Sequence, residues 1–351
     1  MIEIIEHREK WNKLIEACSC ADFYHTYDYH ELDIKEGEKA VLLHFREGEL
    51  SVLLPLILRK ISGTPYSDAT SVYGYPGPLT INCKEGSNLN SFQEALNTYF
   101  NDQKLVSVFS RLNPFIPYQE LLLQGFGEII SPGAVVNIDL TRTEEKQVKA
   151  YHRRLRTYIN SLRKAYTINK TPRPKRIDHF IDIYYENMRR VGAMDRYFFE
   201  RDYFYRLMES PSFDSTLLSA EDPETGEMVA GALFIQKNEI VQYHLSGVQE
   251  GHLKLNPVKL LIDEMRIKAH AEGYRYFNLG GGVANRKDSL LEFKKGYSDD
   301  IRPFKVWRHI VDKEVYAKLV QEKHGGSCIH LPGSCQNFFP CYRCETSKLG
   351  R

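Results

Sequence analysis

The sequence predicts a two-domain α/β protein in which one order of elements occurs twice. Its 351 residues exceed one ordinary compact domain and suffice for two, each with its own core. Hydrophobic residues make up 42% of the chain and charged residues 26%, which is typical of globular proteins. We therefore expect two mixed-sheet copies of one fold. A β-hairpin, a helix and a strand recur in this order, first at 40–58, 90–100 and 105–109, and then at 228–246, 257–272 and 274–279.

The first domain, residues 1–150, contains four candidate ligand-binding residues. Glycine and proline interrupt residues 59–80 so often that we expect a conformationally fixed loop, and long loops of this kind are frequently functional. A rigid structural loop is the alternative. The strand at 105–109 ends beside an arginine, which can bind a carboxylate or phosphate or can pair with an acidic side chain of the protein. The candidates are Asp68, Tyr73, Tyr75 and Arg111.

A basic segment links the two domains. Residues 142–167 predict one amphipathic helix whose apolar side carries Leu155 and whose other side carries Arg153 and Arg156. Residues 1–150 contain 14 basic and 21 acidic side chains, whereas residues 151–351 contain 33 and 25. We therefore expect a phosphate-bearing partner to bind the second half, with a merely solvated helix face as the alternative.

The second domain, residues 151–322, contains the best-defined helix of the sequence, at 257–272. Asn256 can cap this helix, Pro257 suits its first position and Gly273 suits its end. Before it, the pattern predicts helices at 177–190 and 199–209 and a strand at 215–220.

Three consecutive glycines follow the strand at 274–279. Gly280, Gly281 and Gly282 let the backbone pass where side chains cannot, so a ligand can bind there. An ordinary glycine turn is the alternative. The sequence is not G-x-G-x-x-G, and no Walker lysine follows it.

A short helix begins after Asp288, which can cap it. Helical spacing predicts that Leu290, Phe293 and Tyr297 share its packed face. Lys294 is then expected beside that face and near the glycine turn, with its neighbour in the sequence, Lys295, in solvent.

The tail, residues 323–351, is rich in cysteine. Two C-x-x-C pairs at suitable spacing would indicate zinc, but the tail has one, so we expect no metal. Seven cysteines in all, scattered in a long chain that begins without a signal peptide, indicate reduced thiols and a cytoplasmic protein. No apolar run reaches the roughly 20 residues of a transmembrane span. The tail carries Cys328, Cys335, Cys341 and Cys344, with His324 and His330.

Four segments together resemble the FemAB-like branch of the GNAT-fold acyltransferases. They are FNLGGG followed by L-x-x-F-K-x-G-aromatic, DATSVYGYPGPL at 68–79, FSRLNP at 109–114 and FFPCYR at 338–343. The branch includes peptidoglycan-bridge aminoacyltransferases and acetyltransferase-like proteins encoded with polysaccharide genes. The resemblance implies a tandem GNAT fold of two mixed-sheet lobes and a role close to acyl transfer for Phe293 and Lys294.

The implied function is transfer of an acetyl or aminoacyl group to an amine of a cell-envelope sugar or peptidoglycan precursor. The acceptor is a small-molecule or lipid-linked amino sugar. No G-x-S-x-G or Cys/His pattern presents a covalent nucleophile, which favours direct transfer. Polar groups at Tyr243 and His244 also favour an enzyme.

The donor stays open at this stage. Ordinary GNAT enzymes bind the coenzyme A pyrophosphate on a Q/R-x-x-G-x-G/A turn, which the corresponding residues 249–256 lack. Acyl-CoA or aminoacyl-tRNA is therefore expected as co-substrate, with no tightly bound cofactor, a possible tRNA partner and no DNA. The alternative function is a non-catalytic GNAT pair that binds a nucleotide-sugar or RNA.

Overall fold

The chain divides into two compact units that are not contiguous in sequence. The computed structural model describes residues 2–84, 89–175, 177–283, 287–325 and 338–344. Unit 1 comprises residues 1–18, 33–132 and 305–351, and unit 2 comprises residues 19–32 and 133–304. The sequence places boundaries at 150 and 322, whereas the chain of the structure passes between the units several times. Among the described residues, no helix is both long enough and apolar enough to cross a membrane.

Unit 1 is built on a mixed sheet. Its elements are β1 (Ile2–Ile5), α1 (Arg8–Glu16), β2 (Glu38–Glu47), β3 (Leu50–Lys60), β4 (Ser67–Thr70), β5 (Leu79–Ile81), α3 (Asn90–Asp102), β6 (Leu105–Arg111), α4 (Gln119–Leu123), the second part of β13 (Asp300–Ile310), α11 (Lys313–His324) and the 3-10 turn η6 (Cys341–Arg343). The strand order is β1-β2-β3-β4-β6-β13, with β5 on β3. Strands β1 to β4 are antiparallel neighbours, β4 and β6 are parallel, and β13 is antiparallel to β6.

Helices cover both faces of the sheet of unit 1. The pairing of β4 with β6 shifts register between Ser67–Leu105 and Ala69–Val108, and this irregularity interrupts the alternation of side chains along β6. Val108 packs in the cluster that contains Phe92 and Leu96 of α3. Val106 packs on the other side with Leu319 of α11. Each of these apolar side chains is at most 9% exposed. Because both faces of β6 are covered, the strand reads as a nearly continuous apolar run in the sequence.

Unit 2 repeats this plan. Its elements are η1 (Phe23–His25), α2 (Tyr27–Asp33), the second part of β7 (Glu128–Asp139), α5 (Glu144–Lys149), α6 (Arg153–Ala165), β8 (Thr167–Pro172), α7 (Asp178–Arg190), η2 (Asp195–Tyr197), α8 (Arg201–Glu209), β9 (Asp214–Glu221), β10 (Met228–Lys237), β11 (Ile240–Val248), η3 (Glu250–His252), α9 (Val258–Ala271), β12 (Tyr276–Gly280) and α10 (Ser289–Lys295). The strand order is β8-β9-β10-β11-β12-β7. Strands β8 to β11 are antiparallel neighbours, β11 and β12 are parallel, and β7 is antiparallel to β12.

The central strand of unit 2 is also covered on both faces. Gly231 of β10 lies against Phe180 of α7 so closely that a Cβ at this position would be 2.5 Å from the ring. The next residue, Ala232, packs with Leu261 and Met265 of α9. Only glycine at position 231 therefore allows α7 to approach the sheet this closely.

Each unit thus contains four antiparallel strands, a helix and a strand parallel to the fourth. The prediction of two copies is confirmed, but the expected pairing of hairpins is wrong by one strand. The hairpin at 40–58 is β2–β3 and corresponds to β9–β10, not to the hairpin at 228–246. The sequence pattern missed β4 because this fourth strand has four residues, SDAT, within the glycine- and proline-rich segment 59–80.

The last strand of each sheet is exchanged between the copies. β7 follows β6 in the sequence, yet its residues 136–139 pair with β12 in unit 2. β13 follows β12 in the sequence, yet its residues 306–310 pair with β6 in unit 1. Each sheet is therefore completed by the strand that continues from the other copy.

The basic segment 142–167 is two helices and not one. α5 ends at Lys149 and α6 begins at Arg153. Between them, the buried Tyr151 donates its hydroxyl to Asp263 at 2.8 Å, and the amide of His152 donates to the carbonyl of Gly296 at 2.9 Å. These hydrogen bonds hold residues 150–152 out of a continuous helix.

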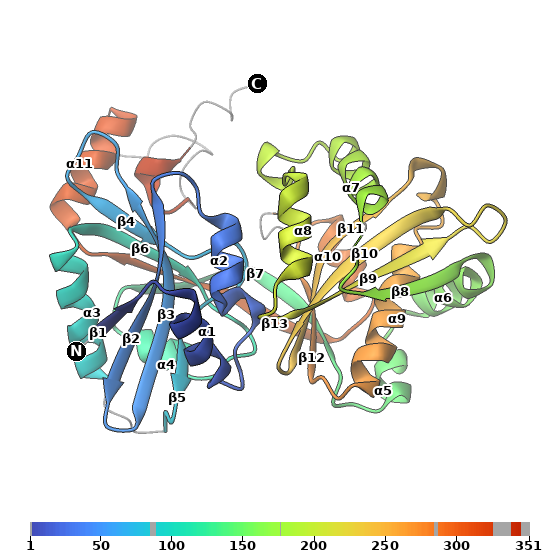
Figure 1. The fold of residues 1–351 in the computed structure, drawn as a ribbon, viewed down its shortest axis with the longest axis horizontal. Helices are drawn as coiled ribbons and strands as arrows, with labels where there is room; N and C mark the ends of the chain where they lie inside the picture. The colour runs from blue at the N-terminus through green and yellow to red at the C-terminus, as the bar shows by residue number, and fades with distance from the viewer. Residues whose placement is uncertain (1, 85–88, 176, 284–286, 326–337, 345–351) are drawn as a thin grey trace. The chain divides into compact units, whose positions relative to one another are not determined.

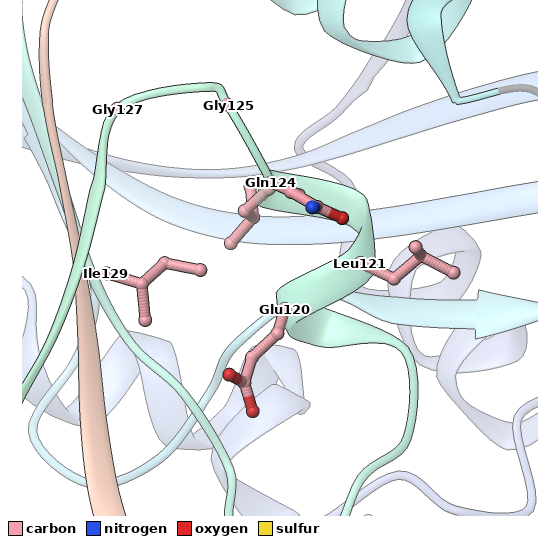
Figure 2. Close-up of a pocket in the computed structure, with 7 residues that line it drawn as sticks. Glu120, Leu121, Gln124, Gly125, Gly127 and Ile129 are labelled. Carbon is pink, nitrogen blue, oxygen red and sulfur yellow. The ribbon is translucent and has the colours of Figure 1, made fainter.

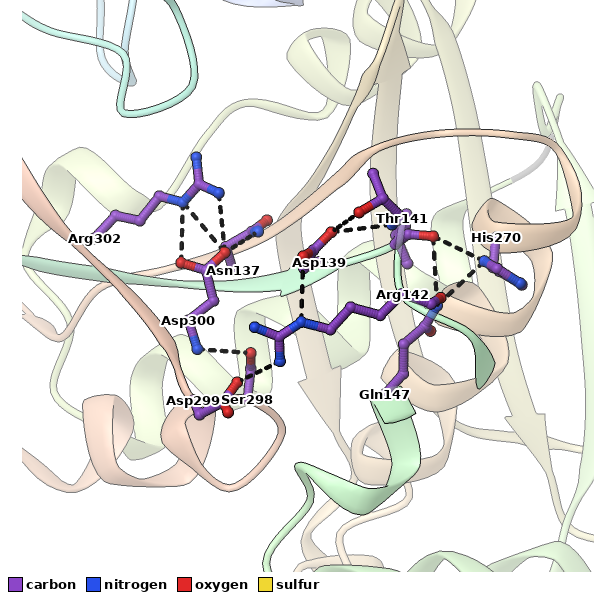
Figure 3. Close-up of polar contacts among 11 residues, drawn as sticks. Asn137, Asp139, Thr141, Arg142, Gln147, His270, Ser298, Asp299, Asp300 and Arg302 are labelled. Atoms are coloured by element: carbon purple, nitrogen blue, oxygen red, sulfur yellow. Dashed lines mark hydrogen bonds and ion pairs between the residues drawn. The ribbon is translucent and has the colours of Figure 1, made fainter. Parts of the chain in front are cut away.

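Polar side chains fix β7 within unit 2, as Figure 3 shows. The fully buried Asn137 donates to Asp300 at 2.7 Å. Arg142 donates to Asp139 at 3.2 Å and to Asp299 at 2.7 Å. These bonds join the end of β7 to the beginning of β13 inside unit 2.

Candidate functional site

Lys294 lies on the buried side of α10, against the glycine turn. Its side chain is 7% exposed, and its Nζ donates to the carbonyl oxygen of Gly281 at 2.7 Å. Lys295 is partly exposed and pairs with Glu292 at 2.7 Å. The predicted placement of the two lysines is therefore confirmed. Burial lowers the pKa of Lys294 to about 8, although the charge of Asp288 opposes this shift, so the ammonium remains the main form at neutral pH.

The packed face of α10 differs from the prediction by one residue. Leu290 is 37% exposed, whereas Leu291 is 4% exposed and Tyr297 is fully buried. Phe293 is partly buried in the same core, with its ring 5.7 Å from that of Tyr297. Because Leu291 and Lys294 are three residues apart, the lysine lies on the packed face itself.

The glycine turn is shaped by its approach to β7. Gly280 has a φ of +75°, which favours glycine. A Cβ at Gly281 would lie 2.6 Å from the carbonyl oxygen of Ala134. Close backbone packing thus explains Gly281, while its own carbonyl is left to accept from Lys294. Gly282 follows and is partly buried.

A buried chain of hydrogen bonds positions this turn. Gln242 of β11 donates to Asp22 at 2.6 Å and accepts from Asn278 of β12 at 2.8 Å. The side chain of Asn278 then accepts the amide of Gly280 at 2.9 Å. Asp22, Gln242 and Asn278 are each at most 2% exposed. No short-range sequence signal connects residues 22, 242 and 278, which is why the pattern did not reveal them.

His244 is the extra residue of a β-bulge in β11. Leu233 pairs with Leu245 and Phe234 pairs with Tyr243, so His244 has no residue opposite it on β10. Residues 243–246 are partly exposed, whereas the rest of β11 is buried. Bulges re-aim side chains and are frequent beside functional sites.

The side chains at the bulge are uncharged at neutral pH. The His244 ring nitrogen Nε2 lies 2.9 Å from the hydroxyl of Tyr203 in α8, and burial lowers the pKa of His244 to about 4. Tyr243 shares a hydrogen bond with Ser246, and burial raises its pKa to about 12. The Nζ of Lys294 lies 5.9 Å from the centre of the Tyr243 ring. Lys294, Gly281 and Tyr243 therefore come together from three elements of unit 2.

The basic side chains of α6 divide into two groups. Arg153 and Arg156, both predicted to bind substrate, lie in the first turn and are exposed. Arg163, at the other end, pairs with Asp263 and Glu264. Arg153 and Arg156 are thus accessible at the first turn of α6, and their contact with a phosphate stays a prediction.

The turn after β11 differs from a phosphate-binding turn in its hydrogen bonds. The backbone amide of Glu250 donates to the carboxylate of Glu186 at 2.9 Å. In a phosphate-binding turn, such an amide would point at the ligand. Asn256 ends the turn with a φ of +51°, and the helix that follows has no side-chain cap, contrary to the expected capping by Asn256.

Asp68, predicted to bind substrate, lies fully buried in unit 1. Its carboxylate accepts hydrogen bonds from Arg59 at 2.8 Å and from Tyr342 at 3.0 Å, and it also pairs with Arg343. These contacts tie β4 to the turn η6, which gives Asp68 a structural role.

Arg111, Tyr73 and Tyr75 lie close together, also in unit 1. The guanidinium of Arg111 donates to the carbonyl of Val72 at 3.2 Å and lies 5.8 Å from the ring centre of the half-exposed Tyr73. The amide of Tyr73 donates to Asp33 at 3.2 Å. The carbonyl of Tyr75 accepts from the side chain of Asn113 at 3.1 Å.

Unit 1 also contains a surface pocket of about 480 Å³. Figure 2 shows that it lies beside α4 and the loop that follows this helix. Its lining includes none of the predicted site residues and no basic group, so it carries little chemistry of its own. The labelled lining residues are Glu120, Leu121, Gln124, Gly125, Gly127 and Ile129.

Comparison with known proteins places the candidate site in a recognised domain. The acetyltransferase (GNAT) domain profile matches residues 149–295, which include Lys294, Tyr243 and His244. No curated protein sequence is significantly similar to the chain.

Solved structures share the fold at low sequence identity. FemX superposes with a TM-score of 0.67 and 14% identity over 90% of this chain and 98% of its own. The C-terminal domain of a putative lysylphosphatidylglycerol synthetase from Agrobacterium fabrum gives 0.53 and 12%, over 86% and 92%. A protein of unknown function from Bacteroides thetaiotaomicron gives 0.53 and 12%, over 88% and 99%.

These matches and the repeated topology confirm the predicted fold. The resemblance to the FemAB-like branch holds at the level of fold, because the full-length similarity to FemX extends across both units. The chain is built on the tandem GNAT fold, and its residues 149–295 match the acetyltransferase (GNAT) domain.

Proposed function

We propose that the chain is a FemAB-like N-acyltransferase. It transfers an acetyl or aminoacyl group to the amine of a cell-envelope sugar or peptidoglycan precursor. The observation that carries this proposal is the buried ammonium of Lys294, held on the Gly281 carbonyl beside Tyr243 in the GNAT domain. Among the described residues no carboxylate pairs directly with Lys294, and because burial of a cation is costly, a site that retains one in this way has a use for its charge.

The reaction requires an anion-stabilising group and a proton acceptor. As the amine attacks the acyl carbonyl, a C–N bond forms and negative charge develops on the carbonyl oxygen, which the Lys294 ammonium stabilises. The candidate for accepting the proton of the attacking amine is His244, whose neutral ring lies 2.9 Å from the hydroxyl of Tyr203. The bond from the acyl carbon to the carrier then breaks, and the carrier leaves as a thiol or as a ribose hydroxyl after protonation. Phe293 packs in the core beside Tyr297 and thereby supports the helix that carries Lys294.

The donor is acyl-CoA or aminoacyl-tRNA. The GNAT fold favours acyl-CoA. The carboxylate of Glu186 accepts the hydrogen bond of the Glu250 amide, and its negative charge disfavours a pyrophosphate at this turn. This contact supports aminoacyl-tRNA as the donor. Both donors act in the cytoplasm, where we place the reaction.

The first turn of α6 supplies the charge that attracts an anionic substrate. Arg153 and Arg156 project from the end of α6 that is anchored to α10 by the bond from His152 to Gly296. A phosphate bound there would lie next to the helix that carries Lys294. The cluster of Arg111, Tyr73 and Tyr75 in unit 1 remains a second candidate for binding the acceptor, and Asp68 anchors the neighbouring strand β4 through Arg59.

A donor and acceptor matrix tests this function. The purified chain is incubated with acetyl-CoA or with a mixture of aminoacyl-tRNAs, and with UDP-linked amino sugars or a lipid-linked muropeptide precursor. Mass spectrometry then measures the acceptor mass. A mass increase of one acyl group with one donor class is the expected result. If ligands raise the melting temperature but no combination gives product, the chain is a binding module and the proposal is wrong.

A further inference from the structure

Three side chains that bind metals in other proteins converge near the end of unit 1. His324 is the last residue of α11, and Cys341 and Cys344 are the first and last residues of the C-x-x-C segment around η6. Their ligand atoms all lie within 4.8 Å of one another. The Nε2 atom of His324 lies 3.6 Å from the sulfur of Cys341 and 3.4 Å from that of Cys344.

We propose that His324, Cys341 and Cys344 form a zinc-binding site. In a tetrahedral site with Zn–S near 2.3 Å and Zn–N near 2.0–2.1 Å, a sulfur and a nitrogen ligand are about 3.6 Å apart. The two observed distances match this edge length, so the nitrogen and the two sulfurs are spaced for the ion once Cys341 is reduced. A mixed thiolate and imidazole set favours zinc over magnesium or calcium. A water molecule or another donor of the chain completes the coordination.

The surroundings favour a cation over simple packing of two thiols. Both cysteines are buried, at 8% and 3% exposure, and Val320 packs against them, so packing alone would account for two small apolar side chains. Packing does not account for the imidazole that points at both sulfurs. His324 also lies at the carboxyl end of α11, where Gly325 ends the helix with a φ of +64°, and the helix dipole favours positive charge at this end.

The ion would join η6 to α11 and thereby stabilise the contacts that η6 makes with the carboxylate of Asp68. Tyr342 and Arg343 lie between the two cysteines and reach the Asp68 carboxylate from there. Tyr342 also shares a hydrogen bond of 2.8 Å with Ser107 of β6. Zinc bound at the turn would therefore stabilise the junction of η6, α11, β4 and β6 without taking part in acyl transfer.

The site depends on the oxidation state of Cys341, which is disulfide-bonded in this structure, contrary to the expected reduced thiols. A thiol or phosphine reductant supplies two electrons and two protons, which convert the disulfide into two thiols. Zn²⁺ then displaces the protons of Cys341 and Cys344 and binds their thiolates. Disulfide and zinc are alternative states of one turn. Cys328, His330 and Cys335 lie outside the described residues and are not part of the proposed site.

The test measures metal in the full-length protein after reduction. The protein is reduced with a phosphine, stripped with a chelator and titrated with Zn²⁺ against a competing chromophoric chelator, and separately with Co²⁺. We expect one equivalent of zinc, and cobalt spectra with thiolate charge-transfer bands and the intense visible bands of tetrahedral cobalt. Octahedral cobalt spectra, or no binding by the reduced protein, would overturn the proposal.

Single variants distinguish this site from other thiols of the chain. Cys344→Ser and His324→Gln should each weaken zinc affinity at least tenfold and lower the melting temperature of the zinc-loaded form. Cys83→Ser, at a partly exposed cysteine elsewhere in unit 1, is the matched control and should bind like the parent. Equal zinc affinity in Cys344→Ser and Cys83→Ser would also refute the site. These readouts do not involve acyl transfer, so they remain valid if the proposed function fails.

Discussion

The two copies of the GNAT fold differ at the point where their parallel strands separate. In unit 1, hydrogen bonds continue beyond β4: the amide of Ser71 donates to Phe109, the amide of Arg111 donates to the Ser71 hydroxyl, and the guanidinium donates to Val72. In unit 2, the ladder between β11 and β12 extends from Ile240 to Gln242. Beyond it, β11 bulges and becomes partly exposed, and β12 turns away at its glycines.

Under the proposed function, this difference assigns different roles to the two units. Unit 1 closes its strand junction with backbone and arginine hydrogen bonds, which favours a supporting role. In unit 2, the ladder ends at Gln242, and beyond it the buried Lys294 lies 5.9 Å from the ring centre of Tyr243. The residues that match the acetyltransferase (GNAT) domain, 149–295, all lie within unit 2.

The largest effect is expected from Lys294→Met. The change keeps most of the apolar stem and removes the charge, and loss of one preorganised charge at a developing oxyanion costs roughly 2.7–4 kcal/mol, about a hundredfold or more in rate. Stability should stay near or above that of the parent, because burial disfavours the ammonium. Steady-state kinetics and thermal melting measure the two effects.

Lys295→Met is the control for that experiment, because Lys295 is partly exposed and pairs with Glu292 on the surface of the same helix. It should retain parental activity. The pH dependence adds a second check: the pKa of Lys294 is about 8, so the parent should lose Lys294-dependent activity as the pH rises through 8. If both variants and the parent have similar rates, Lys294 takes no part in the reaction. The proposed difference in role between the two units would then lose its support.

Acid should destabilise the chain in part through His244. Its pKa is lowered to about 4 in the fold, below the ordinary value of 6.5, so the unfolded chain binds the proton first as the pH falls. Stability is therefore lost between pH 6.5 and 4, by at most roughly 3 kcal/mol for this group. His244→Gln should show a smaller drop in melting temperature over this range than the parent.

His30 and His309 also have pKa values lowered to about 4 by burial, so the difference between variant and parent is the relevant quantity. Identical pH profiles for His244→Gln and the parent would show that His244 is protonated or exposed in the fold.

A smaller effect is expected from Gly281→Ala. The new Cβ would lie 2.6 Å from the carbonyl oxygen of Ala134, and backbone must shift to accept it, at a cost of about 1–3 kcal/mol. The melting temperature should fall, and activity should fall with it as the Gly281 carbonyl moves from Lys294. Gly251→Ala is the control, because a Cβ there has nothing within 4 Å. Equal melting temperatures for the two variants would show that the turn adapts freely.

The smallest effect is expected at the exposed arginines of α6. Replacing Arg153 and Arg156 by Gln should weaken binding of an anionic substrate by up to about 1 kcal/mol per residue and flatten its salt dependence. Lys164→Gln, at the opposite end of the same helix, is the matched control. Affinity that does not change with salt in the parent would contradict an anionic contact at this turn.

The sequence predicted those parts of the fold that local patterns determine. Hydrophobic spacing located α9 and the hairpins, Gly273 marked the end of α9 with a φ of +83°, and Asp288 caps α10 by accepting the amide of Leu291. Motif resemblance found the tandem fold, and the frame of α10 placed Lys294 near the glycine turn. These signals involve residues that are close in the sequence, so they can be recognised without the tertiary structure.

What the sequence missed depends on contacts between distant residues. The sequence pattern missed strand β4 because its four residues lack an apolar pattern. The exchange of β7 and β13 has no local signature in the sequence. Tyr203 lies 41 residues from His244, and Asp22 lies 220 residues from Gln242, yet each pair shares a hydrogen bond. The catalytic and binding roles assigned to the site residues remain predictions.

The strand exchange sets an order for folding during synthesis on the ribosome. A nascent chain generally folds from its amino terminus, one domain at a time. Here the sheet of unit 1 lacks its final strand until residues 306–310 have left the ribosome, after all of unit 2 has been made. The first unit to be synthesised is therefore the last that can close, and until then the exposed edge of β6 needs protection from pairing with other chains.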